Sequence, residues 1–345
     1  MLLPLYALLA YLILVVYASL HPFSGWRDLG LSAFAFLDAG WPRYWTKFDL
    51  FINVLVYFPL GFLLAQTLRR WLGVGLSVLL SSLLAAALSF CLEALQTWLP
   101  SRVPSNLDLA CNIVGAGLGS LLMLPYGARF FSRLAAVQHL LLSSARHAEF
   151  GLVLLALWLL TQLSPENVLF STGDVRYLLG LTPAVSYAAS SFFLIETCII
   201  VCNTLAIGLI LRLFLTEWIN PYKALLSFFT LALLIRTLAT ATLVATHDAL
   251  AWLTPGARYG LLMGAVLLGL LLLLPSAVQL AVAGLALMAG TVLVNLSAPN
   301  PYSLLALASW RQGHFLNFNG LTRLVASIWP FFALLYLMIF GRTSS

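Results

Sequence analysis

The chemistry that this chain could perform depends on seven polar side chains in its first third. They are Asp49, Asn53, Glu93, Gln96, Arg102, Asp108 and Asn112. An ionisable residue within an apolar segment is energetically costly and usually marks a functional site. Two carboxylates such as Glu93 and Asp108 could act as a general acid and base, or could hold a polar head group together with Arg102. The alternative is structural: Arg102 neutralises the acids while Gln96 and Asn112 cap or cross-link helices.

The composition places these residues in a membrane protein. Of 345 residues, 62% are apolar and only 8% are charged, whereas a soluble domain has roughly 45–50% apolar and about 25% charged residues. So few charges cannot cover a water-soluble surface, which excludes soluble enzymes, nucleic-acid modules and disordered linkers. The net charge of +6 does not indicate nucleic acid as a partner, because the arginines are scattered between apolar segments and form no stripe.

Ten segments are long and apolar enough to be considered as membrane spans. About 20 mostly apolar residues cross roughly 30 Å of hydrocarbon as a helix. We therefore predict an all-α fold, a polytopic transmembrane helical bundle of about ten spans. The predicted spans are 2–20, 49–68, 74–99, 107–125, 150–163, 187–215, 224–245, 258–274, 276–297 and 325–340.

The sequence contains no familiar motif of a catalytic or cofactor site. It lacks a Ser-His-Asp order, an HExxH helix and a glycine-rich phosphate loop. Its four cysteines fall inside apolar segments. Cys198 and Cys202 are one helical turn apart, but no histidine or second cysteine pair accompanies them to complete a zinc site. We therefore predict no metal and no cofactor, and we assign no catalytic residue.

Basic residues in short loops predict the orientation in the membrane, because cytoplasmic loops are enriched in lysine and arginine. Arg69 and Arg70 follow the second predicted span, and Arg129, Arg133 and Arg146 follow the fourth. Both loops are predicted to be cytoplasmic, so that the N- and C-termini are cytoplasmic too. Residues 126–148 have the pattern of a basic amphipathic helix on that surface.

With this topology the seven polar residues lie at the outer face. On segment 74–99, Ser82, Ala86 and Ser89 lie within about 40° of Glu93 at 100° per residue, which predicts a narrow polar stripe that packs against a neighbouring helix. Gly115 and Gly119 form a small-xxx-small pair, which is typical of closely packed membrane helices.

The second half of the chain carries buried charges of its own. Glu196 and Arg236 are each about nine residues from the outer ends of their spans, which predicts a buried ion pair; a pathway for an anion or a proton is the alternative. The last outer loop is too long and too polar for a simple connector. Its Arg311 and His314 are additional candidate binding residues.

The polar residues of the first third follow a recognisable spacing: Asp49-x3-Asn53-x5-Pro59-x-Gly61, then Glu93-x2-Gln96-x5-Arg102-x5-Asp108-x3-Asn112-x2-Gly115. This spacing resembles the signature of the VanZ-like family, small bacterial membrane proteins named for a teicoplanin-resistance determinant. The resemblance covers roughly residues 5–125. It implies an envelope role in the bacterial cytoplasmic (inner) membrane, an association with resistance to lipid-tailed glycopeptides, and the motif residues as the site.

These observations predict a three-part chain. Residues 1–125 would form a VanZ-like four-helix membrane domain, residues 126–148 a cytoplasmic connector, and residues 149–345 a C-terminal membrane domain of about six spans. The favoured function is binding of a membrane lipid, or of a lipid-linked or lipid-tailed anionic ligand, in a polar pocket at the outer leaflet. The alternatives are a membrane enzyme that uses Glu93 and Asp108 as acid and base on a lipid-linked precursor, and a transporter.

Overall fold

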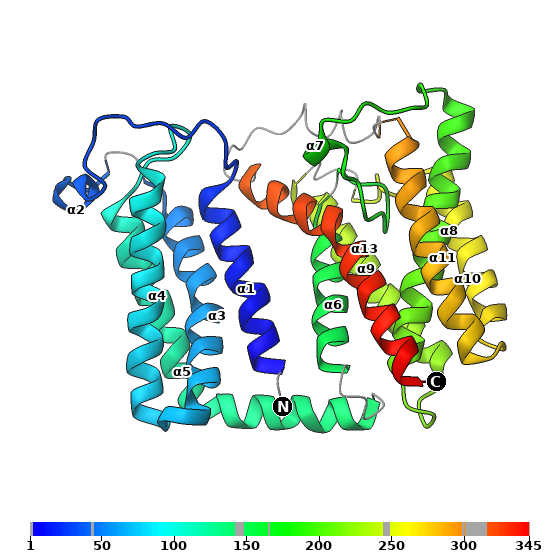
Figure 1. Ribbon diagram of the computed structural model, residues 1–345, viewed down its shortest axis with the longest axis horizontal. Coiled ribbons are helices and arrows are strands. Elements are labelled where there is room, and N and C mark those ends of the chain that lie inside the picture. The colour runs from blue at the N-terminus through cyan, green and yellow to red at the C-terminus, as the bar shows by residue number, and fades with distance from the viewer. Residues whose placement is uncertain are drawn as a thin grey trace. The chain divides into compact units, whose positions relative to one another are not determined.

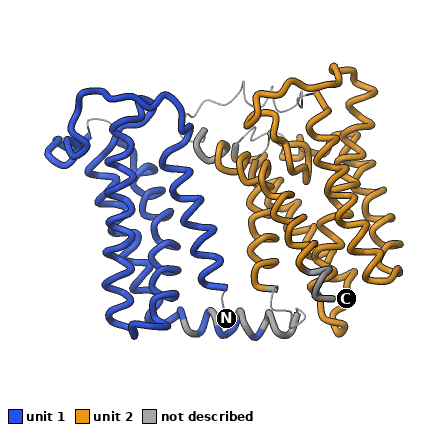
Figure 2. The backbone as a smooth tube through the Cα atoms, viewed as in Figure 1, with its two compact units in different colours: residues 1–139 blue, residues 140–345 orange. Residues whose placement is uncertain are grey.

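The computed structural model of the protein is helical throughout most of the residues that it describes (Figure 1). Described are residues 3–42, 45–141, 148–164, 166–243, 249–298, 300 and 316–344. Within them, eight helices are long and apolar enough to cross a membrane, and two shorter apolar helices occupy the fifth and eighth predicted spans. The predicted all-α polytopic fold is therefore confirmed. The chain divides into two compact units, residues 1–139 and 140–345 (Figure 2).

The described residues of the N-terminal unit form four long helices and one short helix. Its buried core includes Val15, Tyr57, Leu60, Leu92 and Leu99, which come from three of the long helices and the loop after α4. The helices are α1 (Leu3–Leu20), α2 (Ala35–Asp38), α3 (Lys47–Leu72), α4 (Val74–Gln96) and α5 (Asn106–Leu141).

Helices α3 and α5 approach each other so closely that their backbones touch. A Cβ atom at Gly61 would lie 2.0 Å from the carbonyl oxygen of Ala116, and one at Gly119 would lie 1.9 Å from that of Phe58. Gly115 has the same kind of contact, with a Cβ position 2.3 Å from the oxygen of Val54. Such contacts are possible only for glycine, and they explain the close packing that the sequence predicts for Gly115 and Gly119.

The polar stripe on α4 differs from the predicted one. The buried small residues of α4 are Ser77, Ser81, Ala85 and Ser89, four residues apart, and they lead to Glu93. Ser82 is only half-buried, and its hydroxyl donates to its own helix at Val78. Packed helices cross at an angle, so that a contact row follows the i, i+4 ridge and not a line parallel to the helix axis. Ser81 thereby reaches α5, where its hydroxyl bonds the Ser120 hydroxyl at 2.8 Å.

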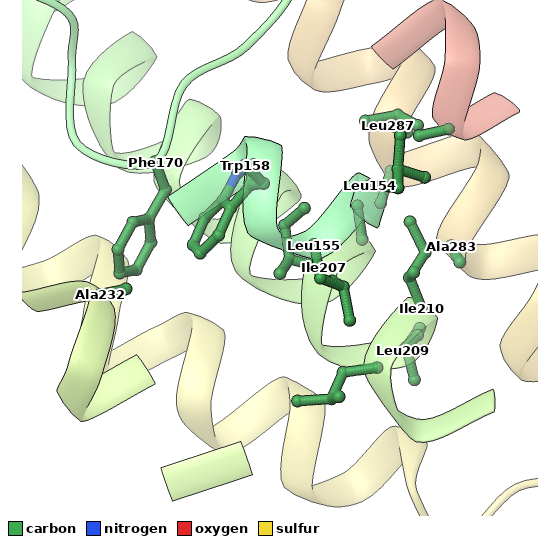
Figure 3. Packing of buried hydrophobic residues seen from close by; sticks show 14 of the residues in the cluster. Leu154, Leu155, Trp158, Phe170, Ile207, Leu209, Ile210, Ala232, Ala283 and Leu287 are labelled. Atoms are coloured by element: carbon green, nitrogen blue, oxygen red, sulfur yellow. The ribbon is translucent and has the colours of Figure 1, made fainter. Parts of the chain in front are cut away.

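The C-terminal unit is built around α8, which is the most buried of its long apolar helices. Its core includes Trp158, Phe170, Ile207 and Trp329, and Figure 3 shows part of it around Trp158 and Ile207. The helices are α6 (Ala148–Thr161), α7 (Arg176–Leu179), α8 (Ala189–Phe214), α9 (Pro221–Leu243), α10 (Pro255–Leu271), α11 (Ser276–Leu296) and α13 (Leu316–Ser344).

A glycine row on α10 allows this helix to lie against α8. Cβ atoms at Gly256, Gly260 and Gly264 would come within 2.2–3.0 Å of α8 side chains, including the Glu196 carboxylate. This spacing of four residues is the small-xxx-small pattern of membrane helix pairs. This row is an additional packing contact that the regular spacing of its glycines in the sequence could have indicated.

Between α6 and α7 a non-helical segment is buried in the C-terminal unit, and its backbone is hydrogen-bonded by side chains. Leu169, Phe170 and Thr172 are at most 2% exposed. The Asn295 amide donates to the Gly173 carbonyl at 2.7 Å and accepts from the Val175 N–H at 3.0 Å. Non-helical backbone at membrane depth requires such internal partners, because lipid supplies none.

The same segment explains why the predicted Glu196–Arg236 ion pair is wrong. The Arg236 guanidinium donates to the backbone carbonyls of Ser164 and Asn167, at the start of this segment. The Glu196 carboxylate instead accepts from the Thr254 hydroxyl at 2.7 Å, at the N-terminus of α10. Two side chains at equal depth in their spans need not pair. Here the buried backbone segment supplies hydrogen-bond acceptors to Arg236 in place of the Glu196 carboxylate.

Candidate functional site

Glu93 lies near the C-terminal end of α4 and is 4% exposed. One of its carboxylate oxygens accepts from the Ser105 backbone N–H at 2.8 Å. Ser105 caps the N-terminus of α5, because its hydroxyl accepts from the Asp108 N–H at 3.2 Å. A single serine therefore links the ends of α4 and α5 and brings the two carboxylates close enough to repel each other.

Three further polar side chains continue from Glu93 into the helix interface. The Asn112 amide group donates to the Ser89 hydroxyl at 2.9 Å. The Tyr57 phenol lies near both the Ser89 hydroxyl and the Glu93 carboxylate. Asn112, Ser89 and Tyr57 are at most 5% exposed, and the Asn112 side-chain oxygen has no hydrogen-bond partner among the described residues.

Asp108 and Asn53 form the more exposed side of this group. Both are half-buried, and the Asn53 side chain lies close to the Asp108 carboxylate. Asp49, one turn before Asn53, adds a repulsive interaction with Asp108. Asp49 itself belongs to a capping box, since its carboxylate accepts from the Thr46 N–H at 2.9 Å and the Thr46 hydroxyl accepts from the Asp49 N–H.

Gln96 and Arg102 have a different role, because they hydrogen-bond the C-terminal end of α1. Arg102 donates through Nη2 to the Ala18 carbonyl at 2.7 Å and through Nε to the His21 carbonyl at 3.0 Å. Gln96 donates to the Ser19 carbonyl at 3.1 Å. Burial lowers the pKa of Arg102, which the nearby Glu93 carboxylate partly offsets; an arginine nevertheless stays charged.

These contacts complete the hydrogen bonding of the last turn of α1. A helix leaves its last four carbonyls without partners in the helix. Here the Tyr17 carbonyl accepts from the His21 N–H and the Leu20 carbonyl accepts from the Phe23 N–H, both at 2.9 Å. Arg102 and Gln96 supply the donors for the other two. Gln96 therefore has the capping role of the structural alternative, whereas Arg102, which that alternative assigned to neutralising the acids, donates to carbonyls of α1.

The structure thus brings most of the predicted residues together and separates them by role. We use the name polar cluster for the side chains that meet between α3, α4 and α5: Asn53, Tyr57, Ser89, Glu93, Ser105, Asp108 and Asn112. Asp49, Gln96 and Arg102 border it and cap helices. Two members were not predicted, although signals existed: Ser105 stands three residues before Asp108, as a helix cap does, and Tyr57 follows Asn53 by one turn.

The two remaining candidates, Arg311 and His314, lie outside the described residues. Near them in the chain, α13 carries Arg323, whose guanidinium lies 4.4 Å from the ring centre of Tyr177. Asp174 and Arg176 form an ion pair at 2.7 Å in the same unit. Among the residues described, no group of three or more His, Cys, Asp or Glu side chains could hold a metal ion.

Comparison with known proteins identifies the family of the N-terminal part of the chain. Residues 5–131 match the VanZ/LLP1 family. No curated protein and no solved structure matches the chain. The matched region contains α1, α3, α4, the membrane-spanning part of α5 and the whole polar cluster. Residues 5–131 of this multi-pass membrane protein are therefore a VanZ/LLP1 family domain.

Proposed function

We propose that the chain binds a lipid-linked or lipid-tailed ligand of the bacterial cell envelope at the polar cluster. The main observation behind this proposal is that four polar side chains lie together between three helices that are otherwise apolar. They are Glu93, Asp108, Asn53 and Asn112. Polar groups in such a place cost free energy unless they are paired. Capping explains Gln96 and Arg102, but it does not explain why two carboxylates should be held next to each other.

The surface beside the polar cluster suits an amphiphile. Phe51 and Leu55 on α3 are 59% and 48% exposed. Since α3 is long and apolar enough to span the membrane, these side chains would face lipid tails. Asp108 is half-buried, so the polar head of an amphiphile can reach it from the helix surface.

The orientation in the membrane is part of the proposal. Arg69 and Arg70 lie in the last turn of α3, at the end opposite to the polar cluster, and the positive-inside rule makes that end cytoplasmic. The polar cluster would then face the outer leaflet of the cytoplasmic membrane, with both termini inside. A reporter fused after Ser345 should report the cytoplasm and one inserted at Ser101 the outer side. The opposite pattern would reverse the orientation.

Resistance to teicoplanin-type, lipid-tailed glycopeptides is the biological role that the family resemblance supports. The test compares cells that express the wild type, Asp108→Asn or Asp28→Asn. Asp28 is an exposed acid in the same unit whose carboxylate only accepts from the nearby Gly30 N–H, so it serves as a matched control. We expect protection against the lipid-tailed drug from the wild type and the control, reduced protection from Asp108→Asn, and none against a glycopeptide without a tail.

Protection must be accompanied by binding. A photoreactive lipid-tailed glycopeptide should label the purified protein saturably, and label should map to α3, α4 or α5. Equal labelling of the wild type and Asp108→Asn, at equal amounts of folded protein, would contradict a role for the polar cluster. Labelling confined to residues 140–345 would place the site in the other unit.

A second candidate is an enzyme acting on a lipid-linked precursor, and the proximity of Glu93 to Asp108 favours it. Two carboxylates in different surroundings can act as acid and base. Glu93→Gln keeps an oxygen that can accept from the Ser105 N–H. If the chain is an enzyme, this variant should bind as before but form no product, which lipid mass spectrometry of expressing cells would detect.

A further inference from the structure

Hydrogen-bond acceptors predominate in and beside the polar cluster. The carboxylates of Glu93 and Asp108 lie near each other, and Asp49 lies near enough to repel Asp108. Among the described residues, the cation that interacts with Glu93 is Arg102, and two of its three guanidinium nitrogens already donate to the carbonyls of Ala18 and His21. The planar guanidinium is held by these bonds. Arg102 is therefore poorly placed to receive a phosphate.

Asn112 gives a second, independent indication that the polar cluster lacks a hydrogen-bond donor. It is 5% exposed, and its amide nitrogen donates to the Ser89 hydroxyl at 2.9 Å. Its oxygen has no partner among the described residues. A buried acceptor without a donor costs about 1–3 kcal/mol. Because Asn112 follows Asp108 by one helical turn, both side chains lie on the same face of α5.

We propose that the polar cluster recognises a ligand group that donates hydrogen bonds and carries positive charge, namely an ammonium group, rather than a phosphate. This inference rests on the proposed function, since it specifies the head group of that lipid-tailed ligand, and it departs from the anionic ligand that the sequence favoured. An ammonium supplies three donors and no acceptor. Asp108, Asn53 and Asn112 offer acceptors, and the Asp108 carboxylate offers the opposite charge. A phosphate would instead approach a carboxylate of its own sign, which is unfavourable.

The test uses three probes that share a dodecyl tail with a photoreactive diazirine and differ only in their heads. The heads are a primary ammonium, a trimethylammonium and a phosphate. The full chain is placed in phosphatidylcholine nanodiscs, and saturable labelling of residues 47–127 is measured against probe concentration. The trimethylammonium keeps the positive charge but lacks N–H donors, so it separates charge from hydrogen bonding. Asp108→Asn is compared with the control Asp28→Asn.

We expect the primary ammonium probe to reach half-saturation at a concentration about ten- to a hundredfold lower than the phosphate, the range for one or two charge-assisted contacts. The half-saturating concentration of the trimethylammonium probe should lie between those of the other two probes. Asp108→Asn should reduce the preference for the ammonium over the phosphate probe about tenfold, and Asp28→Asn should leave it unchanged. Equal or stronger labelling by the phosphate would overturn the inference and leave the proposed function intact. If none of the three probes labels saturably, both fail.

Discussion

The contact between α3 and α5 gives the most exact prediction, because one glycine is packed and a neighbouring one is free. A Cβ atom at Gly119 would lie 1.9 Å from the Phe58 carbonyl oxygen, whereas one at Gly117, half a turn away, meets nothing within 4 Å. Real Cβ contacts essentially never fall below 3.0 Å. In Gly119→Ala the two helices must therefore separate by about 1 Å over a backbone contact that no side-chain rotation can relieve.

The magnitude follows from comparing the two alanine variants. Both gain the same helix propensity, up to about 1 kcal/mol over glycine, so this gain cancels in the difference. What remains is the cost of overpacking, typically about 1–3 kcal/mol. The separation would also strain the neighbouring Ser120 hydroxyl, which lies 2.8 Å from that of Ser81 on α4 and 3.3 Å from the Gly61 carbonyl. We therefore expect Gly119→Ala to be the less stable by about 1–3 kcal/mol.

The assay is reversible unfolding of the purified protein in mixed micelles, followed by the loss of helical circular dichroism as the denaturing detergent increases. Wild type, Gly117→Ala and Gly119→Ala are measured at the same lipid content. Gly117→Ala should be at least as stable as the wild type. Equal midpoints for the two variants would refute the close backbone contact, and so would a larger loss in Gly117→Ala.

Three further predictions concern the bonds around the polar cluster and the buried charges of the C-terminal unit. Arg102→Gln should lower the free energy of unfolding by about 1.5–3 kcal/mol in the same assay, because it removes charged donors to the α1 carbonyls. Arg102→Lys, which lacks the planar guanidinium, should recover only part of this loss. Full recovery in Arg102→Lys would show that the positive charge alone suffices. Burial and the nearby Arg102 lower the pKa of His21, so the folded state favours the neutral imidazole. The resulting stability is present above the unfolded pKa of about 6.5 and is lost as the pH falls from there through the lower folded pKa. The drop in melting temperature from about pH 7.5 to about pH 5.5 should therefore be smaller in His21→Gln than in the wild type, and an equal drop would exclude His21 as its source. The destabilisation of the double variant Glu196→Ala with Arg236→Ala should equal the sum of the single losses within about 0.5 kcal/mol, since the two side chains bind different partners. A larger coupling energy would be evidence for the ion pair after all.

The membrane fold was predictable from the sequence because its signal is strong. Helices must satisfy their backbone internally in lipid, so a run of about 20 apolar residues has few other structures available. The two segments that fall short of a full span, α6 and α10, were included in the predicted ten because apolar length was the criterion. The close packing at Gly115 and Gly119 was also predictable from spacing alone.

Contacts between segments were harder to predict. A rotation of 100° per residue along an isolated helix predicts a stripe through Ser82. The packed row instead runs through Ser81, because α4 crosses α5 at an angle. Arg236 was matched with Glu196 by depth, but the sequence gives no sign that the non-helical segment after α6 would present its carbonyls there. For Arg102, the count of nearby acids suggested neutralisation, and its bonds to α1 depend on a loop whose course no local pattern predicts.

The division between capping and clustered residues determines how substitutions in this domain must be interpreted. Arg102, Gln96 and Asp49 each complete the end of a helix, so their removal should lower the amount of folded protein whether or not a ligand binds. Asp108 is different, because its backbone N–H and not its carboxylate joins the Ser105 cap. A loss of resistance in Arg102→Gln is thus no evidence for ligand contact until it is corrected for stability. A loss in Asp108→Asn at full folded yield is such evidence, and it is the carboxylate of Asp108 on which the proposed site depends.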